Sequence, residues 1–580
     1  MLPSVFAILA IVLYVLLMLM IAVLLPKKVA VIVECILLIA VLAYLFIFLS
    51  FGQAMFLISF GATAYASFGF IIDRGKREKY LEVKRRLDDV DYIEMSMGKE
   101  MKRLAVDVIL TGAVCSGAVL FLLFAPETYT VLKMFIGFML ITFFAKTVER
   151  VGNFSSSRVF WVPTEERLII LSQFQSRELP IQDLKQMSVE SSPDLLKLHP
   201  LFTFLSSNQD YTSSFQRVLK LSFPGDNIYI TLDKIEMWQE LFSKYVDHSD
   251  KQKENLVLPV WHPTVLKRLL LKGYFASTVK GISAYTGLLL LLLWIGAPTW
   301  AMILFVLLWW GVNIYFSDRV LIAASDAEAV RSGHLYERAQ AIFAKAGVGG
   351  TKLYLVDSPI YNGFATGMNI GRGTVVLTSA TLQLPNNAVD AILAHEAMHL
   401  KKRDILTIQL ARFVYFGVLA ASVYLFFDEL QVLADHILLF TLLVYLIMFL
   451  FPIYLSFVSQ WTEVRADYLG GELLAGGRKQ MAEGLTALLN AQEQDLDKQF
   501  EYSATLNNKS SMKKLRPNTN RDSWFWRFLE FQFQAHPPMY WRIMALTKQG
   551  KWSKARKRWV LDRFTESLPD FLRKNQNPQV

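Results

Sequence analysis

Long apolar runs recur along this 580-residue chain and constrain its fold more than any other feature. A bilayer core about 30 Å thick needs roughly 20 mostly apolar residues in a helix. Nine segments come close to that length, at residues 4–25, 29–51, 54–72, 104–124, 131–145, 281–295, 300–316, 405–427 and 437–458. We therefore predict a multi-span α-helical membrane protein with nine spans. The first run has no small-residue cleavage site after it, so we expect it to be an anchor.

Composition agrees with this prediction. Hydrophobic residues make up 53% of the chain and charged residues only 19%, whereas soluble domains have about a quarter charged. The net charge of +10 lies largely beside apolar runs, where Lys and Arg set orientation and meet anionic lipid. We therefore expect the lipid bilayer, and no nucleic acid, as a partner. The two cysteines, Cys35 and Cys115, lie inside apolar runs and predict neither a disulfide framework nor a thiolate metal site.

The loops between the runs predict the orientation. Ten Lys or Arg residues lie between Arg74 and Arg103, and Lys27-Lys28 separates the first two runs. Three alternate loops, at residues 52–53, 126–128 and 428–436, contain no Lys or Arg. Positive loops stay in the cytoplasm, so we predict an N-terminus outside and cytoplasmic segments at 146–280, 317–404 and 459–580. The expected location is a bacterial plasma membrane.

Two acidic residues, Glu34 and Asp107, lie within apolar runs. Ionisable groups inside a membrane are candidates for function. Both, however, are about a turn from a predicted cytoplasmic end. We expect them to reach the interface or to pair with basic neighbours.

Residues 155–248 predict a small cytoplasmic α+β domain. Short β-rich runs alternate with turn signals, and Lys234–Val246 is amphipathic at helical spacing. Strands followed by one C-terminal helix are similar to a pleckstrin-homology (PH) module. Such a domain could bind lipid or a partner, or could be a linker that orders the rest of the chain on the membrane.

A short motif further along the chain predicts a metal site. Asn386 and Asn387 can cap a helix that runs into His395-Glu396-x-x-His399. Side chains four residues apart share one helix face, so both imidazoles can bind one ion. Glu396 is placed to take a proton from an attacking water, as in zinc hydrolases. We predict one Zn2+, with His395 and His399 as ligands and Glu396 as the catalytic base.

A hydrolytic zinc site needs a third protein ligand and one open position. The metzincin class is excluded, because Lys402 and Ile405 stand where it has Gly and His. After the last predicted span, Glu463 and Asp467 lie four residues apart. We predict that Glu463 is the third ligand and that Asp467 orients a ligand histidine. A surface acidic pair is the alternative.

Four motifs in this order resemble the HtpX and CAAX prenyl endoprotease family of integral-membrane zinc peptidases. They are an N-A-F-A-T-G strand, HExxH followed by Asp, ExxAD after a membrane hairpin, and a late HPP with a downstream Arg. The corresponding residues are Asn362-Gly363-Phe364-Ala365-Thr366-Gly367, His395–His399 with Asp404, Glu463–Asp467, and His536-Pro537-Pro538 with Arg542. The resemblance covers about residues 320–550. Gly363 departs from it, as do Gln460 and Thr462, which replace basic residues.

The resemblance implies a mainly helical zincin-type metalloprotease domain that carries a small β-sheet. Residues 362–367 would form an edge strand to which an extended polypeptide substrate adds through backbone hydrogen bonds. Asp404 would join Asp467 in orienting the ligand histidines. His536 and Arg542 would return to the site, where either could stabilise an oxyanion. A helix-capping HPP turn is the alternative.

We therefore predict four parts: a membrane domain at 1–150, a β-rich domain at 151–250, a linker with two spans at 251–320 and a peptidase domain at 321–580. The predicted function is zinc-dependent endopeptidase cleavage of membrane or misfolded proteins at the cytoplasmic face, by direct attack of water. Three alternatives stay open: a CAAX prenyl-type processing protease, a non-hydrolytic membrane sensor or scaffold, and a transporter. The sequence leaves the oligomeric state open.

Overall fold

The computed structural model describes residues 3, 5–125, 130–198, 208–246, 262–275, 298–367, 373–503, 523–548 and 550–569. The chain divides into two compact units. Unit 1 comprises Met1–Thr203, Asn208–Val306 and Lys498–Met512, and unit 2 comprises Phe204–Ser207, Leu307–Asp497 and Lys513–Val580. The finer division into four domains stays a prediction.

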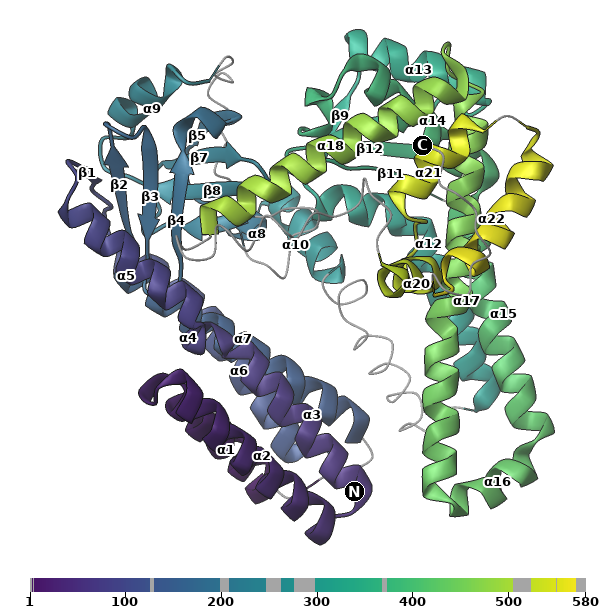
Figure 1. Cartoon of the computed structure of the whole chain (residues 1–580), viewed down its shortest axis with the longest axis horizontal. Coiled ribbons are helices and arrows are strands. Elements are labelled where there is room, and N and C mark those ends of the chain that lie inside the picture. The colour runs from purple at the N-terminus through teal and green to yellow at the C-terminus, as the bar shows by residue number, and fades with distance from the viewer. Residues whose placement is uncertain are drawn as a thin grey trace. The chain divides into compact units, whose positions relative to one another are not determined.

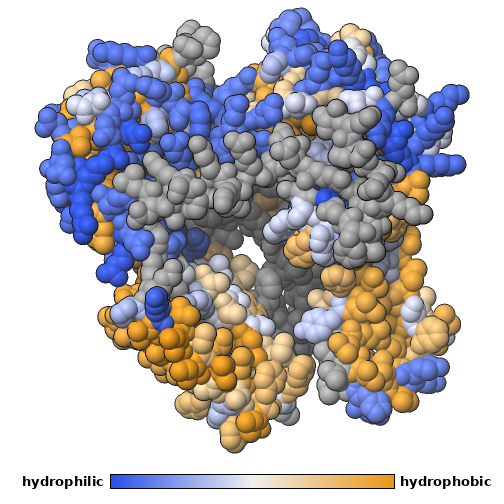
Figure 2. Space-filling model, viewed as in Figure 1, coloured by the Kyte–Doolittle hydropathy of each residue, from blue (hydrophilic) through white to orange (hydrophobic). Residues whose placement is uncertain are grey.

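Unit 1 begins with apolar helices that form a bundle (Figure 1). They are α1 (Val5–Leu24), α2 (Lys27–Phe48), α3 (Phe51–Ser67), α4 (Gly69–Ile72), α6 (Met101–Phe124) and α7 (Thr130–Ser156). Ile11, Leu45, Phe56 and Phe60 form a buried cluster between the first three helices, and Phe138 of α7 packs against it. The outward faces of these helices are also apolar (Figure 2). Surfaces of this kind are stable in lipid rather than in water.

Among the described residues, six helices are long and apolar enough to cross a membrane. They are Phe6–Leu24, Lys28–Phe48, Met101–Phe124, Trp300–Ala324, Asp404–Leu425 and Leu442–Gly471. A seventh candidate is a pair of helices, Phe51–Ser67 and Gly69–Asp88, bent by 43°. Seven of the nine predicted spans thus have a counterpart. The predicted span 131–145 lies inside α7, which is not among these candidates, and the span 281–295 lies outside the described residues.

Asp107 of α6 pairs with basic neighbours, as predicted. Its carboxylate lies 2.5 Å from Arg103 on the same helix and 3.0 Å from Arg150 on α7. Both arginines also contact Asp210 of β6 (Asn208–Tyr211), at 3.1 and 3.6 Å. These four charges therefore fix α6 and α7 to a strand of the following module. The expectation that Glu34 reaches the interface or pairs with a basic neighbour stays a prediction.

The second part of unit 1 is the predicted α+β module. One four-stranded antiparallel sheet has the order β1-β2-β3-β4, and the other has the order β5-β7-β8-β6 with β6 parallel to β8. Helix α9 (Ile235–Ser243) follows the last strand. The strands are β1 (Ile93–Met95), β2 (Arg158–Val162), β3 (Arg167–Leu171), β4 (Ser176–Pro180), β5 (Gln186–Glu190), β6, β7 (Val218–Phe223) and β8 (Asp226–Thr231).

The core of this module draws on residues far apart in the sequence. Both sheets and Trp238 and Phe242 of α9 contribute to one buried cluster, which also includes Tyr502. Tyr502 is 2% exposed, and its hydroxyl donates to Asp183 at 3.0 Å. The basic helix α5 (Arg74–Asp88) packs Val83 and Leu87 on the outer face of β2 and β3. The module therefore needs residues before 155 and after 248 to complete its fold.

Unit 2 builds a four-stranded sheet of order β11-β12-β10-β9, with β11 at one edge. Strands β10 and β12 are parallel, and the two outer strands are antiparallel to their neighbours. The elements are α12 (Thr299–Ala324, which begins in unit 1), β9 (Glu328–Val330), α13 (His334–Ala346), β10 (Lys352–Val356), β11 (Gly363–Thr366), β12 (Thr374–Thr378), α14 (Asn386–Lys402), α15 (Asp404–Leu425), α16 (Phe427–Asp435), α17 (Ile437–Gly471), α18 (Gly477–Ser503, which ends in unit 1), α20 (Trp524–Phe533), α21 (Met539–Thr547) and α22 (Trp552–Glu566).

Helix α14 carries the HExxH motif and runs through the core of unit 2. Residues of α13, the sheet and α18 bury its apolar side chains. The expected asparagine cap is wrong: Pro385 occupies the cap position, and the helix begins at Asn386 with no side-chain cap. Asn386 instead accepts a hydrogen bond from Arg338 of α13. The Pro385 carbonyl accepts the first hydrogen bonds of the helix, from the amides of Ala388 and Val389 at 2.8 and 3.1 Å.

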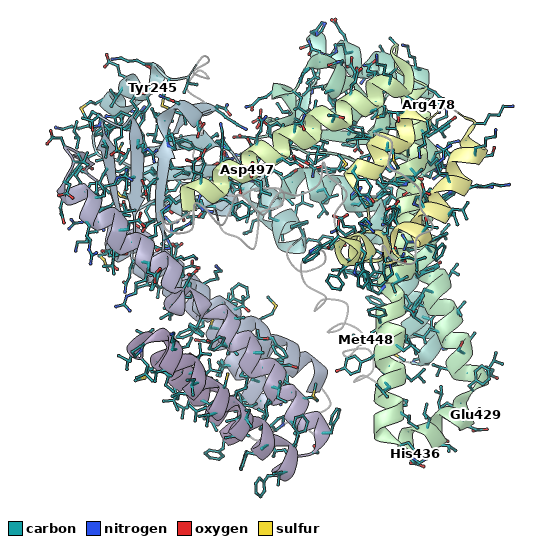
Figure 3. The ribbon with its side chains drawn as sticks, viewed as in Figure 1. Tyr245, Glu429, His436, Met448, Arg478 and Asp497 are labelled. Carbon is teal, nitrogen blue, oxygen red and sulfur yellow. The ribbon has the colours of Figure 1, made fainter. Side chains whose placement is uncertain are left out.

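Helices α15, α16 and α17 form an apolar hairpin (Figures 1 and 2). Glu429 and His436 lie near its far end, and Met448 lies along α17 (Figure 3). Tyr415 of α15 donates to the Ile447 carbonyl of α17 at 2.7 Å. Helix α17 is 35 residues long and contains Pro452, so the apolar span and the Glu463–Asp467 segment belong to one helix.

Candidate metal centre

His395 and His399 of α14 converge on one point. Their Nε2 atoms lie 3.0 Å apart, and the rings are nearly perpendicular at 83°. The helix places them four residues apart on one face. Both side chains are largely buried, at 10% and 13% exposed, so the surroundings limit their rotamers.

Glu463 of α17 brings a carboxylate to the same point. Its oxygens lie 3.4 Å from His395 Nε2 and 3.3 Å from His399 Nε2. In a tetrahedral site with bonds of about 2.0–2.1 Å, two ligand atoms are separated by roughly 3.3 Å. The three spacings match that geometry, and the nitrogens His395 Nε2 and His536 Nδ1 lie 3.4 and 2.8 Å from Glu463 Oε2. The donor set therefore fits zinc, and within the described residues this is the one such cluster of His, Cys, Asp or Glu.

Small residues allow the helices to approach closely enough to assemble this group. A Cβ atom on Gly470 of α17 would lie 3.1 Å from the Ala394 carbonyl oxygen of α14. A Cβ atom on Gly484 of α18 would lie 2.5 Å from Ala391 Cβ. Larger residues at these positions would push α17 and α18 away from α14. Glu463, two turns before Gly470, would move away from the histidines with them.

Each histidine also faces a carboxylate through its other ring nitrogen. His395 Nδ1 lies 2.8 Å from Asp467, and His399 Nδ1 lies 2.8 Å from Asp404. A carboxylate in this position selects the tautomer whose Nε2 lone pair faces the metal and holds the ring in place. The structure thus places both predicted carboxylates against the ligand histidines.

The electrostatics of the site follow from these contacts. Burial lowers the pKa of His395, but its hydrogen bonds to Asp467 and Glu463 outweigh that effect and raise the pKa to about 9. The pKa of His399 is likewise raised, against the effect of burial, by Glu463 and Asp404. Without metal the histidines therefore hold protons that a cation must displace.

The other predicted site residues have different surroundings. Glu396 is 7% exposed on α14. His536 is 62% exposed, and its Nδ1 lies 2.8 Å from Glu463. Arg542 of α21 is buried and donates twice to Asp467, at 2.7 Å for each bond. The Arg542 guanidinium is thus engaged by a carboxylate, whereas the His536 imidazole is accessible to a substrate. A direct catalytic role stays a prediction for both.

The predicted substrate strand lies beside the HExxH helix. Strand β11 pairs with β12 on one side and is an edge of its sheet. The amide of Asn362 donates to the hydroxyls of Thr378 and Thr381, which fixes the start of the strand. A Cβ atom on Gly363 would lie 2.7 Å from Ile392 Cγ2 of α14. The departure from alanine at residue 363 therefore follows from how closely β11 approaches α14.

Gln460 and Thr462, the other departures, have local roles. The Gln460 amide donates to three backbone carbonyls of the segment Glu530–Gln534. Its oxygen accepts a hydrogen bond from the buried Arg563. The Thr462 hydroxyl donates a hydrogen bond to the Ser459 carbonyl of the same helix. Gln460 therefore attaches α20 and α22 to α17, one turn before the candidate ligand Glu463.

Two segments of the chain match known protein families, and the second contains the candidate metal centre. Residues 158–246 match the family Bacterial PH domain, and residues 329–549 match Peptidase family M48. A protease HtpX homolog from Pelotomaculum thermopropionicum is 35% identical over 111 residues, 18% of this chain and 40% of that protein. One from Sulfurovum sp. is 32% identical over 137 residues, 22% of this chain and 50% of that protein. The chain thus spans about half or less of the length of these curated relatives. The crystal structure of S. mikatae Ste24p is 16% identical, covers 49% of this chain and 66% of that one, and has a TM-score of 0.32.

A buried His-His-Glu group on an HExxH helix, at the end of an apolar helical hairpin, defines the class of membrane metallopeptidases. Residues 329–549 match peptidase family M48, and HtpX proteases are among the similar proteins. The resemblance expected from the sequence is therefore confirmed. The PH-like character of the module in unit 1 is confirmed as well.

Proposed function

We propose that this chain is a zinc-dependent endopeptidase that hydrolyses membrane or misfolded proteins at the cytoplasmic face of a bacterial plasma membrane. The observation that carries the proposal is the spacing of His395, His399 and Glu463, which fits one tetrahedral zinc. Three protein ligands leave one position open, which is the arrangement of catalytic rather than structural sites.

When bound, zinc supplies Lewis-acid chemistry: it polarises a carbonyl oxygen and makes water more acidic. Asp467 and Asp404 hold the ligand imidazoles in the orientation seen here. Glu396, on the same helix and largely shielded from solvent, accepts the proton of the attacking water and passes it to the leaving amine. We assign the hydrogen bond to the developing oxyanion to His536, an exposed side chain beside Glu463. No acyl-enzyme forms.

The proposed substrates are polypeptides in an extended conformation. Within the described residues β11 is an edge strand of its sheet, and an edge strand can pair with a substrate strand in a way that selects weakly among side chains. Close packing of Gly363 on Ile392 keeps this edge beside the helix of Glu396. A membrane hairpin that begins at Asp404, directly after α14, supports action on proteins at a bilayer.

The cytoplasmic side is inferred from charge. The end of the hairpin at α16 contains no Lys or Arg, whereas the segments beside the metal centre are rich in both. Under the positive-inside rule, the metal centre then faces the cytoplasm and the N-terminus lies outside.

The experiment uses the purified full-length chain in lipid nanodiscs. Three substrates are compared: an unfolded membrane protein, casein and a peptide with a prenylated C-terminal cysteine. We expect cleavage of the first two, loss of cleavage on chelation, and recovery on addition of zinc. Selective cleavage of the prenylated peptide would establish the processing-protease alternative. Cleavage that persists after complete removal of metal would overturn the proposal.

A further inference from the structure

Asp404, the partner of His399, has a second contact that the sequence did not indicate. Its side chain is 2% exposed and occupies the first position of the membrane helix α15. One carboxylate oxygen faces His399 Nδ1 at 2.8 Å, and the other accepts a hydrogen bond from the guanidinium of Arg465. Arg465 lies on α17, two residues after Glu463.

The Arg465 guanidinium is itself held in place. It stacks over the ring of Trp461, one turn earlier on α17, at 4.3 Å from the ring centroid. Its side chain is 13% exposed. A guanidinium on an aromatic face is attracted by the ring and keeps its planar fork in one orientation. Asp404 therefore meets a cation whose position is fixed before any metal binds.

A buried carboxylate beside a histidine needs such a cation. Without that cation, the carboxylate would turn toward water and release the His399 ring. With Arg465 on one oxygen, the other oxygen stays available to His399 Nδ1. The Nε2 lone pair of His399 then stays directed at the metal position.

The same arrangement occurs at the other histidine. Asp467 contacts His395 Nδ1 and is bound by Arg542. Each ligand histidine thus has a carboxylate, and each carboxylate has its own arginine. The two arginines come from different elements, α17 and α21.

We propose that Arg465 is a positioning residue of the metal centre, acting through Asp404 on His399. Because Asp404 begins α15 and Arg465 lies on α17, their contact also fixes the two membrane helices to each other at the metal centre. This inference rests on the proposed function for its meaning in catalysis, but not for its effect on metal binding.

The test measures the zinc dissociation constant of the full-length chain by competition with a chromogenic chelator. Arg465→Gln should weaken zinc binding by about 10- to 100-fold, the range for loss of a group that supports a ligand. Arg465→Lys should recover part of the affinity, because the charge returns without the planar fork. Asp404→Asn and the double variant Asp404→Asn/Arg465→Gln should bind zinc equally weakly, because Arg465 acts through Asp404.

Arg478→Gln is the matched control. Arg478 (Figure 3) stacks on Tyr468 at 4.6 Å and donates to the backbone carbonyls of Lys548 and Gly550, away from the carboxylates of the metal centre. We expect wild-type zinc affinity from it. Melting of the metal-free variants shows whether each one folds. If Arg465 had a purely structural role, Arg465→Gln and Arg465→Lys would lose equal zinc affinity. The losses of Asp404→Asn and Arg465→Gln would then add up in the double variant. Either result would overturn the proposal. So would a folded Arg465→Gln chain with zinc affinity within twofold of wild type.

Activity separates the two proposals. At saturating zinc, Arg465→Gln should lower kcat with little change in KM, because the perturbed group faces the metal and not the substrate. A wild-type chain that binds zinc tightly but cleaves no substrate would refute the proposed function. The zinc affinities of the variants would still decide the role of Arg465.

Discussion

Replacing Arg542 by methionine should separate the stability of unit 2 from its ability to bind zinc. Arg542 is 7% exposed and Asp467 is 3% exposed, and two hydrogen bonds of 2.7 Å join them. Removing one member of a buried ion pair leaves an uncompensated charge and costs about 3–5 kcal/mol. For a unit of this size, that corresponds to roughly 6–20 °C in melting temperature. The loss arises because Asp467 keeps only His395 as a partner.

The double variant Asp467→Leu/Arg542→Met provides the comparison. Two apolar side chains of similar volume remove the unpaired charge, so most of the lost stability should return. Zinc affinity should not return, because His395 Nδ1 no longer faces a carboxylate.

The assay combines thermal unfolding of the metal-free protein with zinc titration. A shift below about 2 °C for Arg542→Met would show that the pair is not buried as described. Recovery of both stability and zinc affinity in the double variant would refute the orienting role of Asp467.

Three further predictions concern the same region. Zinc affinity should rise by at least tenfold per pH unit between pH 6 and 8, because zinc must displace protons from His395 and His399, whose pKa values are both raised without metal; a flat profile in chelator competition would contradict this. The raised pKa of His395 should also stabilise the metal-free fold below pH 6.5, a contribution that is lost as the pH rises through about 9. Gly363→Ala should lower the free energy of unfolding by about 1–3 kcal/mol, because the new Cβ would lie 2.7 Å from Ile392 Cγ2. Gly349→Ala is the control: its Cβ would have nothing within 4 Å, so its stability should be unchanged. Equal melting temperatures for the two alanine variants would show that β11 does not pack tightly on α14.

Local patterns predicted the parts of the site that depend on one helix. The spacing of His395 and His399 fixes their common face whatever surrounds them. Glu463 was predictable because a hydrolytic zinc needs a third ligand and the chain offers an acidic pair just after a span. The apolar runs predicted most membrane helices for a similar reason: their length is set by the bilayer.

Tertiary contacts account for what the sequence did not reveal. Arg465 meets Asp404 across 61 residues, and no periodicity marks that contact. Tyr502 completes the core of a module whose strands end at residue 231. The asparagine cap was wrong because α14 begins one residue earlier than expected, after Pro385, and Asn386 instead accepts from Arg338 of α13. In each case the contact involves a residue on another element, and a local sequence motif carries no information about it.

The central claim is that one zinc ion and Glu396 together hydrolyse peptide bonds. The most direct test compares the zinc content and cleavage rate of purified wild type, Glu396→Gln, and the control Glu429→Gln, whose exposed side chain lies at the far end of the hairpin (Figure 3). We predict one zinc per chain in all three, full cleavage by wild type and Glu429→Gln, and loss of at least about 100-fold in Glu396→Gln. Retained cleavage by a zinc-loaded Glu396→Gln chain would contradict this account.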